Sequence, residues 1–167
     1  VAQVVPSPFT LEHDATMARL IPDVCGPLLA IEGHFSKGSF VDRDAPFTWR
    51  HDPELSGLNV MQLGIWYEAL MRWVGAAEGV VALGRTFVRS RPDAASDSVR
   101  HTSIPDHLSV LADMECGAQA SLTVTSVCGL DRGSECWFFG EEGTVLFSSR
   151  KIYAGRRGDE RLEEQTI

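Results

Sequence analysis

Apolar residues follow two different spacings along the first half of this chain. From Thr10 to Asp23, and again from Ser56 to Trp73, they recur at the three- and four-residue intervals of a helix, and each segment opens on a side chain that can cap a helix N-terminus. Residues 27–36 instead alternate, which predicts a strand with one apolar face and one mixed face. This half of the chain therefore predicts a short helix, a strand and a long helix.

The second half reads as one strand after another. The predicted strands alternate or are rich in β-branched residues, and they cover residues 80–89, 108–115, 118–127, 135–139 and 144–147. Glycine-containing turns at 115–117 and 140–143 predict antiparallel hairpins. Residues 91–103 combine Pro92 with Ala, Ser and Asp, which predicts a mobile loop. The order of elements predicts an α+β fold: one large, mostly antiparallel sheet with helices packed on one face, in a single domain over residues 1–167.

The long helix is apolar around nearly its whole circumference, so we expect it to be buried on more than one side. Gly75 is placed to end it, and Glu68 and Arg72 are spaced for an ion pair. Asn59, Gln62 and Trp66 fall on a common stripe of this helix.

The strand from Ala118 predicts a second, polar surface on the sheet. Its apolar positions face one way, while Gln119, Ser121, Thr123 and Thr125 face the other. A face of uncharged Ser, Thr and Gln side chains can be solvated or can pack against a second copy of itself.

Composition is that of an ordinary globular protein, with 44% hydrophobic residues and a formal net charge of -8. This charge argues against nucleic acids and anionic membranes as partners, because phosphate contacts require clustered Lys and Arg. Arginines do gather at Arg85, Arg89 and Arg91, and we interpret them as solvated strand ends. No apolar run is long enough to span a bilayer and no signal peptide opens the chain, so we expect a cytoplasmic protein.

The four cysteines have neither the paired spacing of a zinc site nor the density of a disulfide framework. We expect buried free thiols, and no metal site. The chain also lacks a Gly-x-Gly-x-x-Gly turn of the kind that holds a dinucleotide pyrophosphate.

Several segments, taken in order, resemble a known family. Trp49-Arg50 is followed by a Ser-Gly break and by Gln-Leu-Gly-Ile-Trp at residues 62–66; further on come Gly-Ala-Gln-Ala-Ser-Leu at 117–122 and Phe-Gly-Glu-Glu-Gly-Thr at 139–144. Between about residues 20 and 150 the chain resembles the second domain of the Gfo/Idh/MocA family of NAD(P)-dependent oxidoreductases. The absence of the glycine-rich turn and of an initiator Met then suggests an isolated second domain whose N-terminal, dinucleotide-binding partner domain is missing.

The resemblance implies a sugar- or polyol-like substrate, contacted by residues that line the pocket of such enzymes: Trp49, Arg50, Asn59, Gln62 and Trp66. It also implies NAD(P) for the whole protein, with no cofactor bound by this chain alone, and a homodimer or tetramer formed through the open sheet face. The family places a catalytic Asp and His where this chain has Gln62 and Trp66, so the resemblance assigns no catalytic residue here.

Alternatives remain for Arg50, Trp66 and His51. Arg50 can bind a substrate beside Trp49 or form an ion pair with Asp52 or Glu54, and Trp66 can be a stacking platform or a core aromatic. His51 can reach the mouth of a pocket or be an exposed loop histidine. The chain as a whole is either the substrate-binding and oligomerisation domain of an oxidoreductase or a non-catalytic small-molecule-binding or assembly module derived from that family, and the sequence does not decide whether it is an enzyme.

Overall fold

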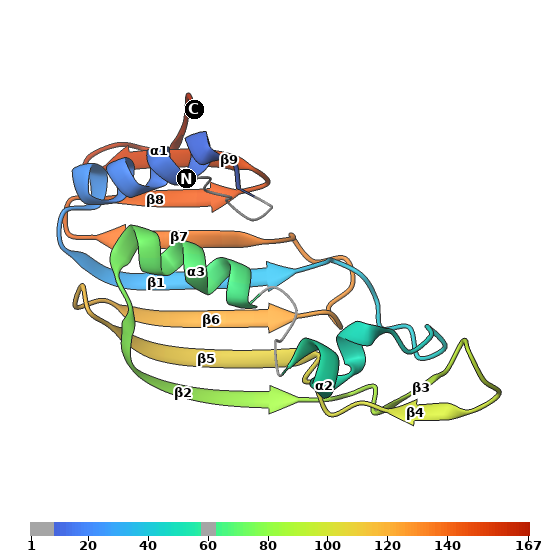
Figure 1. Cartoon of the computed structure of the whole chain (residues 1–167). Helices are drawn as coiled ribbons and strands as arrows, with labels where there is room; N and C mark the ends of the chain where they lie inside the picture. The colour runs from blue at the N-terminus through green and yellow to red at the C-terminus, as the bar shows by residue number, and fades with distance from the viewer. Residues whose placement is uncertain (1–8, 58–62) are drawn as a thin grey trace.

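The computed structural model describes residues 9–57 and 63–167, and it has the α+β architecture that the sequence predicts (Figure 1). One sheet of eight strands has the order β10-β9-β8-β7-β1-β6-β5-β2. Its strands are β1 (Leu28–Ser36), β2 (Ala77–Arg85), β5 (His107–Met114), β6 (Gln119–Thr125), β7 (Glu135–Gly140), β8 (Gly143–Ser148), β9 (Lys151–Arg156) and β10 (Glu163–Gln165). Of the neighbouring pairs, β1 and β6 run parallel and the others antiparallel. The sheet is thus two antiparallel meanders joined at the central strand β1.

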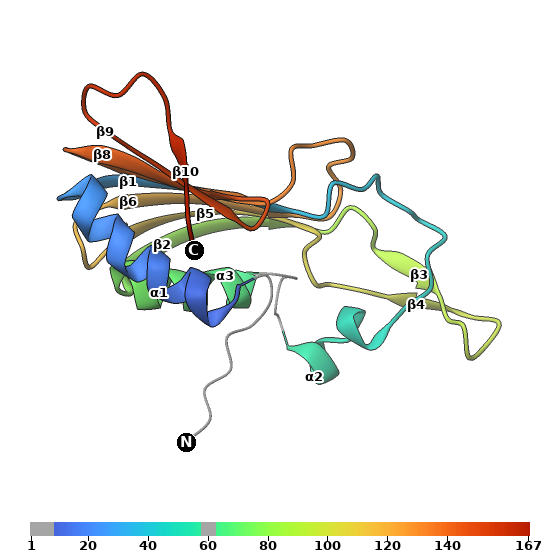
Figure 2. The same cartoon turned by 90° about the horizontal axis from the view of Figure 1, so that it is seen from above.

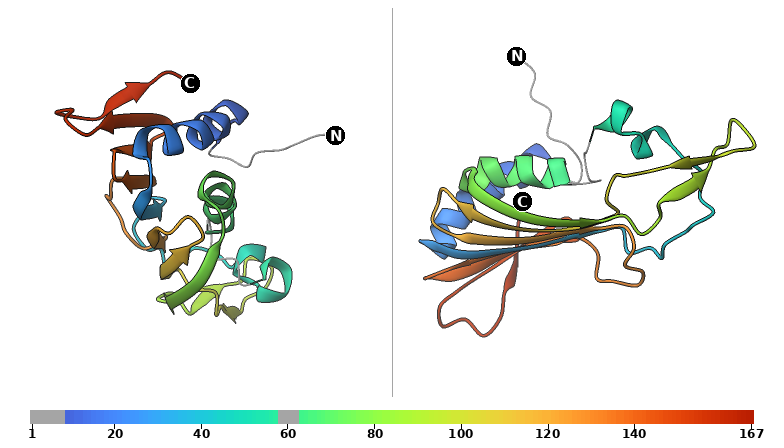
Figure 3. Two further views of the ribbon diagram at one scale, coloured as in Figure 1. Left: turned by 90° about the vertical axis from the view of Figure 1, so that its left-hand side faces the viewer. Right: turned by 90° about the horizontal axis from the view of Figure 1, so that it is seen from below.

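The helical segments are α1 (Leu11–Leu20), a π-helical turn (Ile21–Cys25), a 3-10 turn (Trp49–His51), α2 (Pro53–Ser56) and α3 (Leu63–Val74). Both α1 and α3 lie on the same side of the sheet (Figure 2), and the sheet curves around them (Figure 3). The opposite side carries no helix among the described residues. The prediction of helices on one face is confirmed.

The first helix begins with a reciprocal cap that the sequence only partly revealed. Thr10 Oγ1 accepts from the His13 backbone N–H, and His13 Nδ1 lies 2.7 Å from Thr10 Oγ1. His13 is buried, and its Nε2 donates to the Arg150 carbonyl at 2.9 Å, which ties α1 to the turn between β8 and β9. Helical structure then continues through Pro22 as the π-helical turn, and it ends at Gly26 with φ of 62°.

Two predicted boundaries are wrong. Ser56 does not cap a long helix: it is the last residue of α2, and its hydroxyl donates to the Asp52 carbonyl one turn earlier. Residues 91–103, predicted as a mobile loop between two strands, contain strands of their own: β3 (Ser90–Pro92) pairs with β4 (Val99–His101) in a hairpin that extends beyond the end of the main sheet (Figure 1). The end of α3 follows the prediction, since the Gly75 N–H donates to Met71 and Gly75 has φ of 89°.

The core lies between the helices and the concave sheet face. On β6, Ala120, Leu122 and Val124 are buried there, while Gln119 and Ser121 are exposed on the other side, as the alternation predicts. Thr125 departs from the pattern, being 1% exposed. The cysteines divide as well: Cys25 and Cys136 are buried, Cys128 is half-buried and Cys116 is exposed, so burial is confirmed for only part of the set.

Glycines shape the contact between the π-helical turn and the β7–β8 hairpin. A Cβ on Gly140 would overlap the Cys25 carbonyl oxygen, and one on Gly143 would lie 2.6 Å from the Val24 carbonyl oxygen. Side chains at these positions would force the hairpin away from the helix. The two glycines therefore permit a backbone-to-backbone approach that brings α1 and the sheet together.

Candidate functional site

The exposed Trp-Arg pair is carried by a segment that leaves the end of β1 and extends beyond the sheet, next to the β3–β4 hairpin (Figure 2). Phe47, just before the pair, is nearly buried, and its N–H donates to the Pro92 carbonyl at 2.7 Å. The segment is therefore docked on the hairpin before the pair begins.

Local hydrogen bonds close the 3-10 turn that contains the pair. His51 Nδ1 accepts from the Thr48 N–H at 2.9 Å, and the Asp52 N–H donates to the Trp49 carbonyl at 3.2 Å. The turn leaves Trp49 on the surface, 54% exposed. An indole with half of its area in water is an available contact surface for a ligand.

Arg50 stacks on this indole, as the sequence suggested. Its guanidinium carbon lies 4.2 Å from the centre of the Trp49 ring. The competing ion pair with Asp52 does not form, because the Asp52 carboxylate accepts from Arg100 at 2.8 Å. Stacking restricts the long arginine side chain and leaves its N–H groups available in a fixed orientation.

Two arginines that the sequence analysis did not assign to the site hold it in place. Arg91 donates from Nη1 to the carbonyls of Asp42 at 2.9 Å and Ala45 at 3.2 Å, so it is a structural anchor and not a solvated strand end. The Arg100 guanidinium lies 3.9 Å from the centre of the Phe47 ring. Both belong to the β3–β4 hairpin, which had been predicted as a loop.

Asp52 and His51 follow the pair in sequence, and the pKa of each is lowered, for a different reason. The hydrogen bond from Arg100 lowers the pKa of Asp52, and the Glu54 N–H adds to this effect. Burial lowers the pKa of His51, and the positive charges of Arg91 and Lys37 lower it further. His51 is therefore neutral near pH 7; because its Nδ1 accepts from the Thr48 N–H, the proton resides on Nε2.

Trp66 lies in the core and not on a pocket wall. It is 0% exposed, its ring stacks on Phe35 with centroids 4.2 Å apart, and Phe9 meets it edge-on at 4.9 Å. Phe147 packs against the same ring. A side chain enclosed in this way cannot touch a ligand in this conformation, so the structure supports the core interpretation of Trp66 over the stacking platform.

The other two predicted pocket residues, Asn59 and Gln62, lie outside the described residues. The helix α3 is well anchored: Arg72 bonds Glu68 at 2.7 Å, which confirms the predicted ion pair, and Arg72 Nε also donates to Asp14 of α1 at 3.1 Å. Trp73 Nε1 donates to the same carboxylate at 2.8 Å. These bonds tie α3 to α1.

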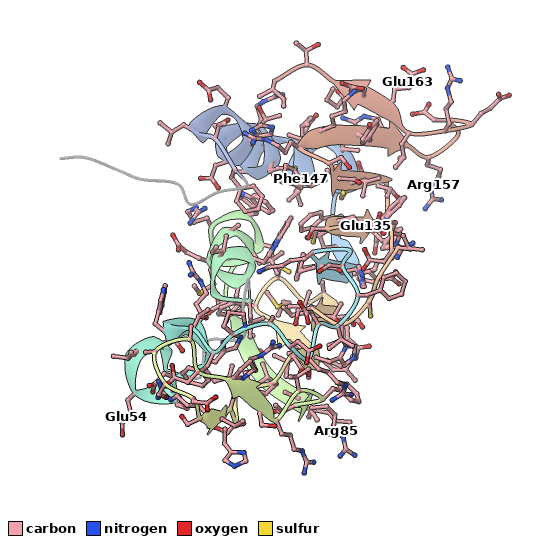
Figure 4. All side chains as sticks on the ribbon, turned by 90° about the vertical axis from the view of Figure 1, so that its right-hand side faces the viewer. Glu54, Arg85, Glu135, Phe147, Arg157 and Glu163 are labelled. Carbon is pink, nitrogen blue, oxygen red and sulfur yellow. The ribbon has the colours of Figure 1, made fainter. Side chains whose placement is uncertain are left out.

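A separate groove of about 470 Å³ lies on the open face of the sheet. The parallel rings of Trp137 and Phe139 line it, with centroids 5.8 Å apart, and residues 155–162 form its rim. Figure 4 shows Arg157 of this rim and Glu54 of α2 at opposite ends of the molecule. The groove is therefore distinct from the Trp49–Arg50 site.

Within the ranges 9–57 and 63–167, no three His, Cys, Asp or Glu side chains are grouped to hold a metal ion. Across the same ranges, no helix has the length and apolar character needed to cross a membrane.

Solved structures share this fold. An NAD binding oxidoreductase from Klebsiella pneumoniae superposes with a TM-score of 0.77 at 19% identity, over 92% of this chain and 43% of that one. Levoglucosan dehydrogenase in complex with NADH and levoglucosan gives 0.74 at 18% identity, over 90% and 42% of the two chains. A super-repressor mutant of Gal80p from Saccharomyces cerevisiae gives 0.70 at 13% identity, over 92% and 43%. Identities this low establish the fold alone.

The chain spans less than half the length of these structures. No curated protein matches it. The sequence profile of the GFO/IDH/MocA C-terminal domain, however, matches residues 16–146, which is most of the chain. The chain therefore belongs to the GFO/IDH/MocA family, and the part of that family that it represents is the C-terminal domain.

Proposed function

We propose that this chain is the substrate-binding and oligomerisation domain of an NAD(P)-dependent oxidoreductase that acts on a sugar- or polyol-like substrate. The observation that carries the proposal is the Trp49–Arg50 stack, held on the surface by the β3–β4 hairpin within a domain of this family. Among the structural neighbours, levoglucosan dehydrogenase was solved with NADH and with a sugar, either levoglucosan or L-sorbose.

The chemistry of the pair suits a polyhydroxylated ligand. An indole face packs against the C–H face of a sugar ring, while a guanidinium donates several N–H groups to hydroxyl oxygens. Because Trp49 already orders Arg50, little side-chain freedom is lost when a ligand binds. Asp52 and Arg100 keep the turn in place without occupying the free N–H groups of Arg50.

We assign no catalytic base to this chain. The family's His position holds Trp66, whose indole does not titrate and is enclosed in the core. His51, next to the Trp49–Arg50 pair in sequence, is a titratable alternative, but its Nδ1 accepts from the Thr48 N–H and its Nε2 carries the proton, so in this arrangement it is a donor. Proton transfer in the proposed enzyme then depends on groups outside the described residues.

The dinucleotide is expected to be held by a domain outside this chain. The glycine-rich 140–143 turn does not fit a pyrophosphate, because carbonyl oxygens of Cys25, Val24 and Gly155 surround Gly140 and Gly143. A phosphate site requires converging N–H donors, and these groups are acceptors. The substrate site and the nicotinamide would meet only where the two domains join.

Oligomerisation is assigned to the open sheet face. Leu111 on β5 and Val81 on β2 are direct cross-strand neighbours on this face and are 53% and 74% exposed. Leu83 extends the apolar patch, and Ser109 and Ser121 continue it as small uncharged side chains. An exposed patch of this kind favours packing against a second copy.

The test uses the longer protein in which a dinucleotide-binding domain precedes this one. We expect oxidation of sugars or polyols with NAD⁺ or NADP⁺, and we expect Trp49→Ala and Arg50→Ala each to raise KM about tenfold or more. Arg19→Ala, an exposed arginine on α1, is the matched control and should leave KM unchanged. Unchanged KM in both site variants would overturn the assignment of the pair to the substrate.

A non-catalytic module is the second candidate. It is favoured by the absence of the family's Asp and His at positions 62 and 66, and by a fold shared with Gal80p, which in Kluyveromyces lactis is described as a transcriptional regulator. Sugar binding by the longer protein, measured by calorimetry, together with no turnover across a polyol panel, would support this candidate over the first.

A further inference from the structure

Two arginines in the segments that carry and support the Trp49–Arg50 pair keep their positive charge. Arg91 donates to two backbone carbonyls of residues 42–45, and Arg43 donates to a backbone carbonyl at 3.1 Å. Among the described residues neither guanidinium takes part in an ion pair. A carbonyl oxygen satisfies an N–H donor but carries no net charge, so these contacts anchor the segments without neutralising them.

Arg50 also lacks an acidic partner within the described part of the chain. The carboxylates closest to it in sequence belong to Asp52 and Glu54. Asp52 pairs with Arg100 at 2.8 Å, and no ion pair joins Arg50 to Glu54. The Trp49 ring fixes the Arg50 guanidinium at 4.2 Å. A guanidinium that is held in place with its N–H groups unused is prepared for a bidentate contact with a carboxylate.

The charges that act on the turn next to Arg50 are positive. Burial lowers the pKa of His51, and the charges of Arg91 and Lys37 lower it further, so both lie close enough to act on the His51 ring. The net charge of the whole chain is -8, and this gathering of cations is therefore opposite in sign to the molecule around it. A site of one sign attracts ligands of the other.

We infer that the ligand of the Trp49–Arg50 site is a sugar acid and that Arg50 binds its carboxylate, an assignment that rests on the proposed function of the pair as a substrate contact. A neutral sugar would leave the guanidinium without a counter-ion, whereas a planar carboxylate matches its fork of N–H groups. The exposed Trp49 ring would then pack against the C–H face of the same molecule.

The site suits a carboxylate better than a phosphate. Phosphates bind where free backbone N–H groups converge, typically at a helix N-terminus. Helix α2 begins close to the pair, but Asp52 caps it and accepts from the Glu54 N–H at 3.0 Å. A protein carboxylate thus already occupies the position that a phosphate would need, and Glu54 adds a second negative charge in the first turn.

The ligand carboxylate is an anchor and takes no part in the oxidation. The substrate carbon that carries the oxidised hydroxyl gives its hydride to NAD(P)⁺, and the hydroxyl proton passes to a base outside the described residues. Because Arg50 is fixed on Trp49, a bidentate contact would set the distance from the carboxylate to the reacting hydroxyl. The contact would therefore determine which acids are oxidised.

Matched substrates test the assignment in the longer protein, in which a dinucleotide-binding domain precedes this chain. Uronates and aldonates are compared with the neutral hexoses and hexitols that have the same hydroxyl configuration. For at least one acid we expect kcat/KM to exceed that of its neutral parent by about tenfold or more, the effect of one charge-assisted bidentate contact. Turnover of neutral sugars without any such preference would overturn the assignment and leave the proposed function intact. Failure to bind either class would contradict both.

Variants separate a carboxylate contact from a hydroxyl contact. Arg50→Gln should raise KM for the acid about tenfold and change KM for its neutral parent less than twofold. Arg50→Lys keeps the charge without the fork and should fall between Arg50→Gln and the wild type. Lys37→Gln removes a nearby charge and should raise KM for the acid about twofold. Added salt should weaken binding of the acid alone.

Arg19→Gln is the matched control, because it removes the same charge from an exposed position on α1, at the opposite end of the molecule from the β3–β4 hairpin (Figure 1). It should change KM for neither ligand. An Arg50→Gln variant that weakens acid and neutral parent equally would overturn the assignment, because Arg50 would then contact hydroxyl groups and the substrate would need no charge. In that outcome the pair would still be the substrate contact of the proposed function.

Discussion

Arg100 donates to the Asp52 carboxylate across 2.8 Å, and this contact joins two segments that are 48 residues apart in the sequence. Asp52 is at the same time the N-cap of α2, where it accepts from the Glu54 N–H at 3.0 Å. One carboxylate thus fixes both the start of α2 and its position on the β3–β4 hairpin. The exposed Trp49–Arg50 pair ends two residues before Asp52, whose N–H donates to the Trp49 carbonyl, so the contacts of Asp52 also hold the pair in place.

Arg100→Ala is expected to loosen residues 47–56 without unfolding the domain. The substitution removes the ion pair to Asp52 and the stacking on Phe47 together, while the main sheet is untouched. Amide hydrogen exchange should become several-fold faster at Leu55 and Ser56, whose N–H groups donate to the Asp52 carbonyl. Arg89→Ala, an exposed arginine beside the same hairpin, is the control. Equal exchange in both variants would mean that the hairpin does not hold the site.

Truncation of Trp66 is expected to destabilise the domain strongly, and truncation of Trp49 is expected to have little effect on stability. Trp66→Ala opens a cavity among Phe35, Phe9 and Phe147, and it should lower the free energy of unfolding by about 3–5 kcal/mol. Trp49→Ala removes an exposed ring and should change it by no more than about 0.5 kcal/mol. Urea unfolding measures both. A mild effect of Trp66→Ala would make that residue a candidate ligand contact again.

Local sequence patterns predicted the strands and hairpins of this domain but not which tryptophan is buried. The alternation on β6 and the turn glycines predicted the strands and hairpins, because those signals depend on near neighbours. The burial of Trp66 had no such signal: its helix is apolar all round, so a residue facing a cavity and one facing the core look the same in sequence. Only the positions of Phe35 and Phe147, set by distant strands, decide between them.

The same limit applies to the arginines that anchor the site. Arg91 and Arg100 lie in a stretch rich in Ala, Ser and Asp, and that composition is typical of loops. Their partners are the carbonyls of Asp42 and Ala45 and the carboxylate of Asp52, more than 40 residues earlier in the sequence. A single sequence gives no indication of such pairs, whereas Arg50 and Trp49 could be predicted to stack because they are adjacent.

Gly140→Ala is expected to destabilise the domain by about 1–3 kcal/mol, because the new methyl group must displace the Cys25 carbonyl and with it the π-helical turn. Gly79→Ala is the matched control: its added methyl group meets nothing within 4 Å, and a change within about 0.5 kcal/mol is expected. Thermal unfolding at low protein concentration compares the two. Equal effects would show that the hairpin can move away from the helix at little cost.

Asp131 provides a pH-dependent contact at the end of β1. Its Oδ2 lies 2.8 Å from His34 Nε2, and its Oδ1 accepts from the Gly133 N–H at 2.9 Å. The hydrogen bond with His34, followed by that with Ser36, lowers the pKa of Asp131 to about 2. An aspartate in an unfolded chain has a pKa of about 3.9, so folding favours the ionised carboxylate.

Asp131→Asn should therefore lower Tm at pH 5 by about 2–4 °C and by progressively less in acid. The wild-type carboxylate contributes its full stabilisation above about pH 3.9, and it loses this contribution as the pH falls toward its folded pKa of about 2. Near pH 2 the two proteins should melt together. Glu160→Gln removes the same charge from an exposed position in the 156–162 turn, and its Tm difference should be small at every pH. If the Tm difference between the wild type and Asp131→Asn stays constant down to pH 2, the variant perturbs the loop through its shape and not through its lost charge.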